Sequence, residues 1–300
     1  MDTQTSCSAA ELHDYGAIAV SGSDARAFLH TQLTNDVEHL PAGQARYAGW
    51  CSAKGRLLAT FLVVPQEEGF LLQLARELVP AIQKRLQMFV LRSKVTLADA
   101  SAEWAQFGVW GAGVAERLRA LGIEMPGSDL AIAQAADRIA VRLQGQQVVL
   151  FVRAAKRGEV QAALPQGDAA AWALEEIRAG RPHLTQATQD LFVPQMVNLE
   201  RLGGVDFKKG CYPGQEIVAR AQYRGQLKRR MVRLRAPQPL RPGQDLYSED
   251  FAGQASGTVL NAAGGEALAV LQIATLESGA AVRIEPGGAA LEVLPLPYPA

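Results

Sequence analysis

The chain has 300 residues, of which 48% are hydrophobic and 20% are charged, and its formal net charge is zero. These values are ordinary for a globular protein that buries several cores without disulfides or a structural metal, and they exclude a global attraction for nucleic acid or anionic lipid. The length predicts two or three structural units. No apolar run approaches the roughly 20 residues of a membrane helix, and the start lacks the pattern of a secretion signal, so we expect a cytoplasmic protein without membrane contact.

The first 190 residues alternate between patterns typical of strands and of helices. An apolar strand precedes a helix that Ser23 or Asp24 can cap. A hairpin follows, whose turn is Ala53-Lys54-Gly55. In chain order, the pattern predicts strands at 17–20, 47–52, 57–64 and 70–74, a helix at 77–91, strands at 94–97 and 105–110, a helix at 113–121, a hairpin at 139–152 and a helix at 168–179. This is an α+β domain of two similar layers, although no sequence repeat proves a duplication.

The composition changes near residue 237, where prolines and a glycine cluster over seven positions. Beyond this cluster the helical period disappears, and four short apolar stretches separated by glycines predict a small β-barrel or sandwich, at 258–261, 267–273, 281–284 and 291–294. We therefore divide the chain into an α+β domain, residues 1–230, and a C-terminal β-barrel domain, residues 231–300. The proline-rich end, 295–300, predicts an extended tail.

Three cysteines, Cys7, Cys51 and Cys211, are far apart and odd in number, which fits neither a disulfide framework nor a paired metal site. A lone cysteine is usually a small buried hydrophobe, and we accept this interpretation for Cys7 and Cys51. Cys211 differs because glycines, lysines, a proline and a carboxylate surround it. Since residues 203–235 follow neither a helical nor a strand period for long, we expect successive turns to hold Cys211 on a projecting loop.

Charged neighbours give this thiol a candidate chemistry. Lys208 and Lys209 favour the thiolate, which is the nucleophilic and metal-binding form, and Gln215 and Glu216 can orient a group or accept a proton. Nine bases and one acid lie between residues 208 and 235, either as a solvated face or as a site for an anion. RNA phosphate and a carboxylate-rich small molecule both fit such a site, and three aromatic side chains could stack on a flat heterocycle: Phe207, Tyr212 and Tyr223.

The run Lys209-Gly210-Cys211-Tyr212-Pro213-Gly214-Gln215-Glu216 resembles the signature of the YgfZ family, Lys-Gly-Cys-Tyr-x-Gly-Gln-Glu, which stands here intact. This family comprises folate-binding relatives of the glycine-cleavage T-protein, an aminomethyltransferase. The resemblance covers nearly the whole chain and is weak only in its C-terminal part. It extends through residues 28–36, 54–56, 92–95, 192–195 and 198–199.

The resemblance implies an α+β fold in which a two-lobed, aminomethyltransferase-like folate-binding domain precedes a small C-terminal β-barrel around a central channel. It implies tetrahydrofolate or another folate as ligand, no stably bound metal, and a part in the synthesis or repair of iron–sulfur proteins, including radical enzymes that thiomethylate tRNA. Cys211 would be the critical thiol and Lys209 would stabilise its thiolate. The other motif residues would support them: Lys208, Gly210, Tyr212, Gly214, Gln215 and Glu216. The candidate folate contacts are Asn35, Asp36, Lys54, Arg178, Asn198, Arg220 and Tyr223.

One position departs from the T-protein pattern. There the corresponding helix ends in Arg-x-Glu-Ala-Gly, whose acid helps to bind the pterin, and here Arg178 takes the place of that acid. A carboxylate can accept hydrogen bonds from the amino and ring N–H groups of a pterin, whereas a guanidinium only donates. The pterin must therefore be held differently, and aminomethyl transfer by the T-protein mechanism is disfavoured.

The leading hypothesis is thus a folate-dependent accessory protein for iron–sulfur enzymes. Its thiol could act as a nucleophile, or it could transiently ligate iron or a cluster together with ligands from a partner. The alternative is an enzyme, a folate-dependent one-carbon transferase of T-protein type. Direct tRNA binding through the arginine-rich run ranks last, because the net charge is zero and no recognised RNA-binding motif occurs.

Overall fold

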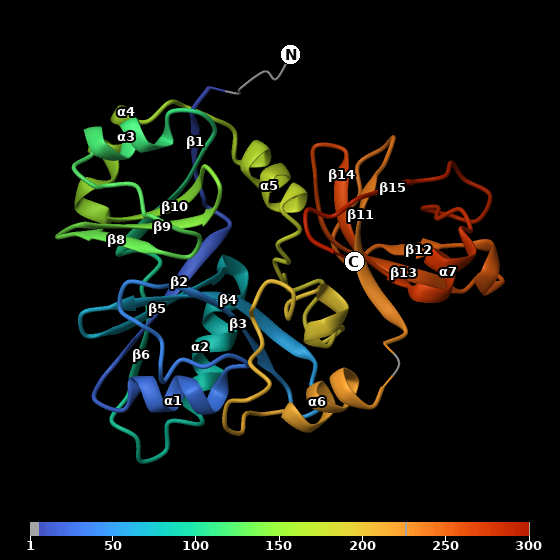
Figure 1. Ribbon diagram of the computed structural model, residues 1–300, viewed down its shortest axis with the longest axis horizontal. Helices are drawn as coiled ribbons and strands as arrows, with labels where there is room; N and C mark the ends of the chain where they lie inside the picture. Colours follow the sequence, from blue (N-terminus) through green and yellow to red (C-terminus); the bar gives the residue numbers. More distant parts are fainter. Residues whose placement is uncertain (1–5, 226, 300) are drawn as a thin grey trace. The chain divides into compact units, whose positions relative to one another are not determined.

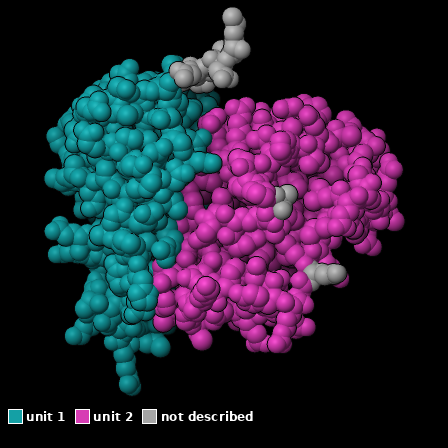
Figure 2. Space-filling view, viewed as in Figure 1, with its two compact units in different colours: residues 1–29, 37–46, 62–172 teal, residues 30–36, 47–61, 173–300 magenta. Residues whose placement is uncertain are grey.

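The computed structural model describes residues 6–225 and 227–299 (Figure 1). The chain divides into two compact units, which Figure 2 shows in different colours. Unit 1 comprises Met1–Leu29, Val37–Arg46 and Leu62–Trp172, and unit 2 comprises His30–Asp36, Tyr47–Phe61 and Ala173–Ala300. Within the described ranges, no helix is long and apolar enough to cross a membrane.

Two antiparallel sheets share one connectivity, with the strand orders β3-β4-β5-β2-β6 and β8-β9-β10-β7-β1. The first is built from β2 (Tyr15–Ser21), α1 (Ala25–Gln32), β3 (Arg46–Cys51), β4 (Leu57–Gln66), β5 (Gly69–Ala75), the 3₁₀ helix η1 (Arg76–Leu78), α2 (Val79–Gln87) and β6 (Thr96–Asp99). The second is built from β7 (Trp104–Trp110), α3 (Val114–Ala120), β8 (Ile132–Ala135), β9 (Arg138–Gln144), β10 (Gln147–Arg153), the 3₁₀ helix η2 (Ala154–Lys156) and α4 (Arg157–Ala163). The N-terminal strand β1 (Ser8–Glu11) supplies the edge strand that β6 supplies to the first sheet. The two similar layers predicted from the sequence are therefore present.

The inner strands of these sheets have continuous apolar sequences because they are covered on both faces. β5 lies between β4 and β2, β10 lies between β9 and β7, and six residues of β5 and five of β10 are buried. A strand covered on both faces needs apolar side chains at successive positions rather than at alternate ones. One polar pair interrupts this core: the Nε2 atom of Gln73 on β5 donates to Oε1 of Gln106 on β7 at 2.7 Å, so the two buried amides bond each other.

The C-terminal part of unit 2 is a five-stranded sheet of order β12-β13-β14-β11-β15. The elements that follow α4 are α5 (Ala169–Arg178), the 3₁₀ helix η3 (Pro194–Val197), α6 (Gln215–Tyr223), β11 (Arg229–Arg235), β12 (Asp245–Tyr247), the 3₁₀ helix η4 (Glu249–Phe251), β13 (Ala255–Ala263), β14 (Glu266–Gln272), α7 (Ile273–Ser278) and β15 (Glu292–Leu294). As predicted, the Asp168 carboxylate accepts the N–H of Ala170 at the start of α5, and Gly180 after its end is left-handed, with φ of 67°. The chain is thus α+β with a C-terminal sheet domain, the predicted fold class.

Several predicted elements are wrong in their bounds. The helix predicted at 77–91 ends at Gln87, and the strand predicted at 94–97 occupies Thr96–Asp99. The apolar period misled the first prediction, because Met88, Phe89 and Leu91 are exposed and Leu91 turns the chain with φ of 47°. The sequence pattern also left β1, β8, α4 and β12 unassigned, all of which are short.

The region from 203 to 235 is more regular than its sequence suggests, since it contains α6 and β11. α6 has one buried residue, Val218, so its apolar period is too weak to recognise. Beyond residue 237 the chain does form a helix, the six-residue α7. Among residues 281–284 there is no strand, only isolated bridges. The proline-rich end is not a free tail: the Tyr298 hydroxyl donates to the carbonyl of Gly180 at 2.7 Å.

Candidate functional site

Lys209 anchors the loop that carries Cys211 to the rest of unit 2. This lysine is only 9% exposed, and its ammonium donates to the carbonyls of His30 and, at 2.7 Å, of Leu33. These carbonyls lie at the C-terminal end of α1, where a cation satisfies unpaired oxygens and complements the helix dipole. The same ammonium lies 5.1 Å from the ring centre of Tyr212. Lys209 therefore ties the motif to the helix end and turns its charge away from solvent.

A second set of bonds fixes the segment just before the motif. The hydroxyl of Thr34 donates to the carbonyl of Gly204 at 2.6 Å, and the amide of Asn35 donates to the carbonyls of Tyr47 and Gly203. The Asp206 carboxylate then accepts the backbone N–H groups of the two following lysines, at 2.7 and 3.2 Å. Side chains thus satisfy backbone groups of the segment 203–209 where no helix or strand does so.

Two glycines allow the turn between β3 and β4 to pack against the motif. Gly214 has φ of 77° and Gly55 has φ of 70°, a conformation that other residues rarely adopt. A Cβ atom on Gly214 would lie 2.4 Å from the carbonyl oxygen of Ser52 and 2.6 Å from the Cα of Gly55. A Cβ atom on Gly55 would lie 2.8 Å from the Cβ of Ile217. The motif glycine is therefore required by both space and backbone conformation.

Cys211 is exposed, whereas Cys51 is buried and Cys7 is half-buried. Burial and the nearby Asp190 carboxylate raise the pKa of the Cys51 thiol to about 12, and burial also raises the pKa of Cys7. The neighbour of Cys211, Tyr212, lies in the core that Cys51 and Val218 also help to form, and burial raises the pKa of its hydroxyl. The loop therefore inserts Tyr212 into the core and leaves the adjacent thiol in solvent.

The predicted folate contacts fall into two groups. Asn35, Asn198 and Arg178 have protein partners: Asn35 bonds two carbonyls, Asn198 bonds the carbonyl of Met231 and a guanidinium, and Arg178 forms ion pairs with two glutamates. Asp36 lies 3.0 Å from the imidazole of His30. The side chains of Lys54, Arg220 and Tyr223 are exposed. Whether any of these residues contacts a folate stays a prediction.

The run of nine bases is divided by its partners. Four of the nine contact protein acceptors: Lys209 as described, Arg230 with Glu200 at 2.5 Å, Arg233 with Glu266 at 3.5 Å, and Arg235 with Glu292 at 2.6 Å. Of the five bases that remain, Arg229 is half-buried, and the other four are exposed: Lys208, Arg220, Arg224 and Lys228. Gln215 begins α6, and the exposed Glu216 lies in its first turn, where a carboxylate stabilises the helix.

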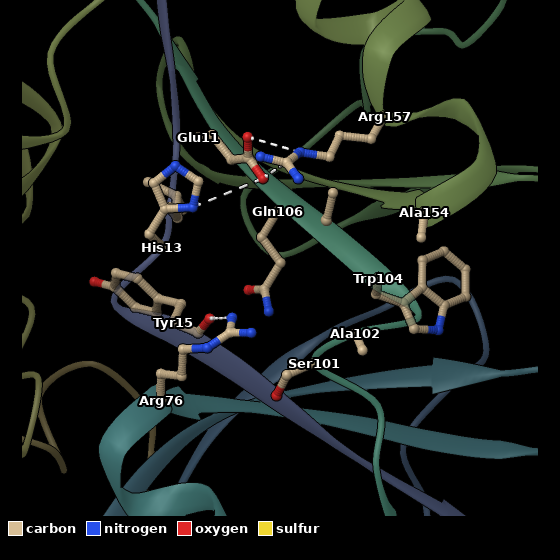
Figure 3. Close-up of a pocket in the computed structure, with 12 residues that line it drawn as sticks. Glu11, His13, Tyr15, Arg76, Ser101, Ala102, Trp104, Gln106, Ala154 and Arg157 are labelled. Atoms are coloured by element: carbon tan, nitrogen blue, oxygen red, sulfur yellow. Dashed lines mark hydrogen bonds and ion pairs between the residues drawn. The ribbon is translucent and has the colours of Figure 1, made fainter.

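Unit 1 contains an open cavity of about 370 Å³, shown in Figure 3. Figure 3 shows the Glu11 carboxylate between His13 and Arg157, at 3.8 and 3.0 Å. Arg76 points into the same space, and its guanidinium donates to the carbonyl of Tyr15 at 3.5 Å. The lining thus combines two arginines, an imidazole and a single acid.

The shared connectivity of the two sheets creates this cavity. Tyr15 begins β2 and Trp104 begins β7, while Arg76 begins η1 and Ala154 begins η2. These are equivalent positions of the two layers, and all four line the cavity. The cavity was not predicted from the sequence, because its residues are far apart along the chain and no motif marks them.

Metal ligands do not cluster within residues 6–225 and 227–299. In these ranges no group of three or more histidine, cysteine, aspartate or glutamate side chains could hold a metal ion.

Comparison with known proteins identifies the chain. It is 32% identical over 302 residues to the tRNA-modifying protein YgfZ of Edwardsiella ictaluri (strain 93-146), covering 96% of this chain and 91% of that protein. It is 31% identical to the protein of the same name from Klebsiella pneumoniae (strain 342), with the same coverage. The chain belongs to the YgfZ family. The predicted resemblance is therefore confirmed.

Family models and a solved structure describe the architecture of this YgfZ family member further. Residues 1–155 match the GCVT N-terminal domain, and residues 228–297 match the C-terminal β-barrel domain of CAF17. The crystal structure of glycine cleavage system aminomethyltransferase T from Bartonella henselae superimposes with a TM-score of 0.78 at 19% identity, covering 97% of this chain and 86% of that one. The aminomethyltransferase-like fold with a C-terminal β-barrel is thus the fold of this chain.

Proposed function

We propose that this YgfZ family member is a folate-binding accessory protein that acts in the synthesis or repair of iron–sulfur proteins, including those that thiomethylate tRNA, through the Cys211 thiol. One observation carries the proposal: of the three cysteines, Cys211 is the exposed one, and it lies in the intact family motif. Lys209 and Tyr212, the motif residues on either side of Gly210 and Cys211, are buried. The relatives' name, tRNA-modifying protein, supports the tRNA part of the proposal.

The geometry supports a thiol that acts on a partner. A side chain in solvent between buried anchors is presented at a constant position, and a second molecule can reach it. The thiol could attack a partner's thiol or a one-carbon adduct, or it could join ligands from a partner in holding iron or a cluster transiently. The described residues near it do not supply a further set of metal ligands, so the second mechanism takes the remaining ligands from the partner.

The cavity of unit 1 supports the folate part of the proposal. A folate carries an anionic glutamate tail, and Arg76 offers the donors that a carboxylate requires, while Arg157 and His13 already face the carboxylate of Glu11. Tyr15 and Trp104 line the same space, and the half-buried ring of Tyr15 suits the planar part of a ligand, while the ring of Trp104 is buried and carries the guanidinium of Arg153 at 4.0 Å. A volume of about 370 Å³ lies within the usual range of small-molecule sites. These residues would hold and orient the ligand, and a bound folate would supply one-carbon chemistry.

The alternative, a one-carbon transferase of T-protein type, has less support. Arg178 stands where the T-protein has its pterin-binding acid, and its guanidinium is paired with Glu175 at 3.2 Å and Glu266 at 3.5 Å. A guanidinium only donates hydrogen bonds, so Arg178 cannot replace that acid as the acceptor for the N–H groups of a pterin. Turnover of a folate donor with an amine or thiol acceptor would be the evidence for this alternative.

The test is replacement of Cys211 by Ala in cells that lack the native protein, with Cys7→Ala as the matched control. Activity of iron–sulfur enzymes and the level of thiomethylated tRNA should fall with Cys211→Ala and persist with Cys7→Ala. Unchanged levels with Cys211→Ala would remove the thiol from the proposal.

Folate binding is tested separately, by calorimetric titration of the purified protein with tetrahydrofolate. Arg76→Ala should weaken the affinity about tenfold, as expected when one hydrogen-bonded charge pair is lost, while Arg92→Ala should not. A wild-type titration without binding would refute the folate assignment, and equal affinities in wild type and Arg76→Ala would refute the cavity as its site.

A further inference from the structure

The surface around α6 combines free positive charge with exposed aromatic and apolar side chains. We call this set the α6 surface and define it by Lys54, Lys208, Ile217, Arg220, Tyr223 and Arg224. All six belong to unit 2, as does Cys211. Ile217 and Tyr223 are among the few large apolar side chains left exposed in the described chain, at 40% and 69%.

Local geometry places these residues beside one another. On α6, Ile217 and Arg220 are three residues apart and share one helix face, and Arg224 is the residue directly after the helix end. The Cβ of Ile217 lies against Gly55, which brings the turn with Lys54 to this face. At the other end of the helix the ring centre of Tyr223 lies 5.9 Å from that of Phe207, the residue before Lys208.

The bases of the α6 surface differ from the rest of the arginine-rich run. Three of the four arginines on β11 are held by glutamates: Arg230 by Glu200 at 2.5 Å, Arg233 by Glu266 at 3.5 Å and Arg235 by Glu292 at 2.6 Å. Among the described residues, Lys54, Lys208, Arg220 and Arg224 have no ion pair. One acid, Glu216, lies on the exposed side of α6 itself. The zero net charge of the whole chain therefore conceals a local excess of positive charge.

The aromatic ring favours RNA over an acidic protein as the partner. Tyr223 stands almost free in solvent, where a ring gains nothing from the core, and its edge-on contact with Phe207 holds it in place. Unpaired bases stack on such rings while arginines and lysines contact the adjacent phosphates. An acidic protein face would match the charges but would leave the ring without a planar partner.

We propose that the α6 surface binds a single-stranded segment of RNA beside the Cys211 loop. Tyr223 would stack on a nucleobase, and the four lysine and arginine side chains of the surface would contact phosphates. The proposal rests on the proposed function, because relatives called tRNA-modifying proteins make tRNA the natural source of such a segment. It adds direct binding of the RNA by this chain, at a named surface.

The experiment measures binding of the full chain to a fluorescently labelled, unmodified tRNA transcript by anisotropy, at 50 and 200 mM salt. Four phosphate contacts on a single strand predict a loss of affinity of about 50-fold over this range. In Arg220→Ala/Arg224→Ala two contacts remain, and the loss shrinks to about sevenfold. Tyr223→Ala should weaken binding about tenfold or more with little change in the salt dependence, since stacking releases few counterions.

The matched control is Lys84→Ala/Arg92→Ala, which removes two exposed bases from unit 1 and should bind like the wild type. Equal losses in the control and in Arg220→Ala/Arg224→Ala would overturn the proposal, as would a Tyr223→Ala affinity equal to that of the wild type. Tetrahydrofolate titration of the same variants separates the two assignments. If folate affinity falls while tRNA affinity holds, Arg220 and Tyr223 are folate contacts and the RNA proposal is wrong, while the proposed function stands.

Discussion

Replacing Lys209 by Met should destabilise the protein, because this side chain closes the end of α1. The substitution keeps an unbranched apolar stem and removes the ammonium that donates to the carbonyls of His30 and Leu33. Hydrogen bonds to a charged group contribute about 1.5–3 kcal/mol each to the free energy of unfolding. Leaving a buried carbonyl without a donor accounts for much of this loss, because the oxygen is not resolvated. With one of the two carbonyls only partly buried, the expected loss is about 3 kcal/mol of the free energy of unfolding.

The assay is urea unfolding of the purified protein at pH 7, followed by tryptophan fluorescence, together with the melting temperature Tm. A loss of about 3 kcal/mol should lower Tm by roughly 5–10 °C. Lys208→Met is the matched control, since Lys208 is the adjacent, exposed lysine of the same loop. It should unfold within about 0.5 kcal/mol of the wild type, as surface substitutions usually do.

The same pair of variants separates two roles for Lys209. If its ammonium mainly stabilises the Cys211 thiolate, Lys209→Met should unfold like the wild type and shift the pH profile of Cys211 alkylation by iodoacetamide. If it mainly closes α1, stability should fall and Lys208→Met should leave both measurements unchanged. A stability loss below about 0.5 kcal/mol for Lys209→Met would refute the role of this ammonium in closing α1.

Three further outcomes are expected. A thiol reagent at pH 8 should modify Cys211 rapidly, while Cys51 should react only after unfolding, because Cys51 is buried and its pKa is raised to about 12. A Cys211→Ser variant that keeps the fast phase of modification would contradict this prediction. Gly214→Ala should cost about 2–4 kcal/mol, because its Cβ has no room, whereas Gly122→Ala, at a left-handed glycine with open space, should cost about 1 kcal/mol, and equal Tm values for the two would be unexpected. Burial lowers the pKa of His183 to about 4, so between pH 6.5 and 4 the unfolded state binds a proton that the folded state does not. The free energy of unfolding should therefore fall by at most about 3 kcal/mol as the pH is lowered through this window. His183→Gln should flatten this part of the stability curve, measured by urea unfolding.

Strands and helices with a strong period were predictable from the sequence. β2, β4, β5, β7, β9 and β10 form continuous or alternating apolar runs, and their predicted positions agree with the structure within a few residues. The prediction failed where tertiary packing decides the element. α6 has a single buried residue and β11 carries four arginines, so neither shows a period that local reasoning can find.

The candidate site was also predictable only where a local sequence pattern marks it. An intact motif identified Cys211, and its exposure agrees with the predicted projecting loop. The neighbouring lysines could not be told apart, because adjacency in sequence says nothing about which ammonium reaches a carbonyl of α1. Nor could the cavity at Glu11 and Arg157 be seen, since the two side chains that pair there are separated by 146 positions in the sequence.

By itself, the sequence determined the family, the fold class and the position of the motif cysteine, because a motif and a hydrophobic period are local properties of the chain. The tertiary structure alone decided how the charges near that thiol are used. It buries Lys209 under the loop, pairs three of the four arginines of β11 with glutamates, and leaves Lys208, Arg220 and Arg224 in solvent. The reason is physical: the role of a charged side chain depends on its burial and its partners, and both are set by contacts between residues distant in sequence.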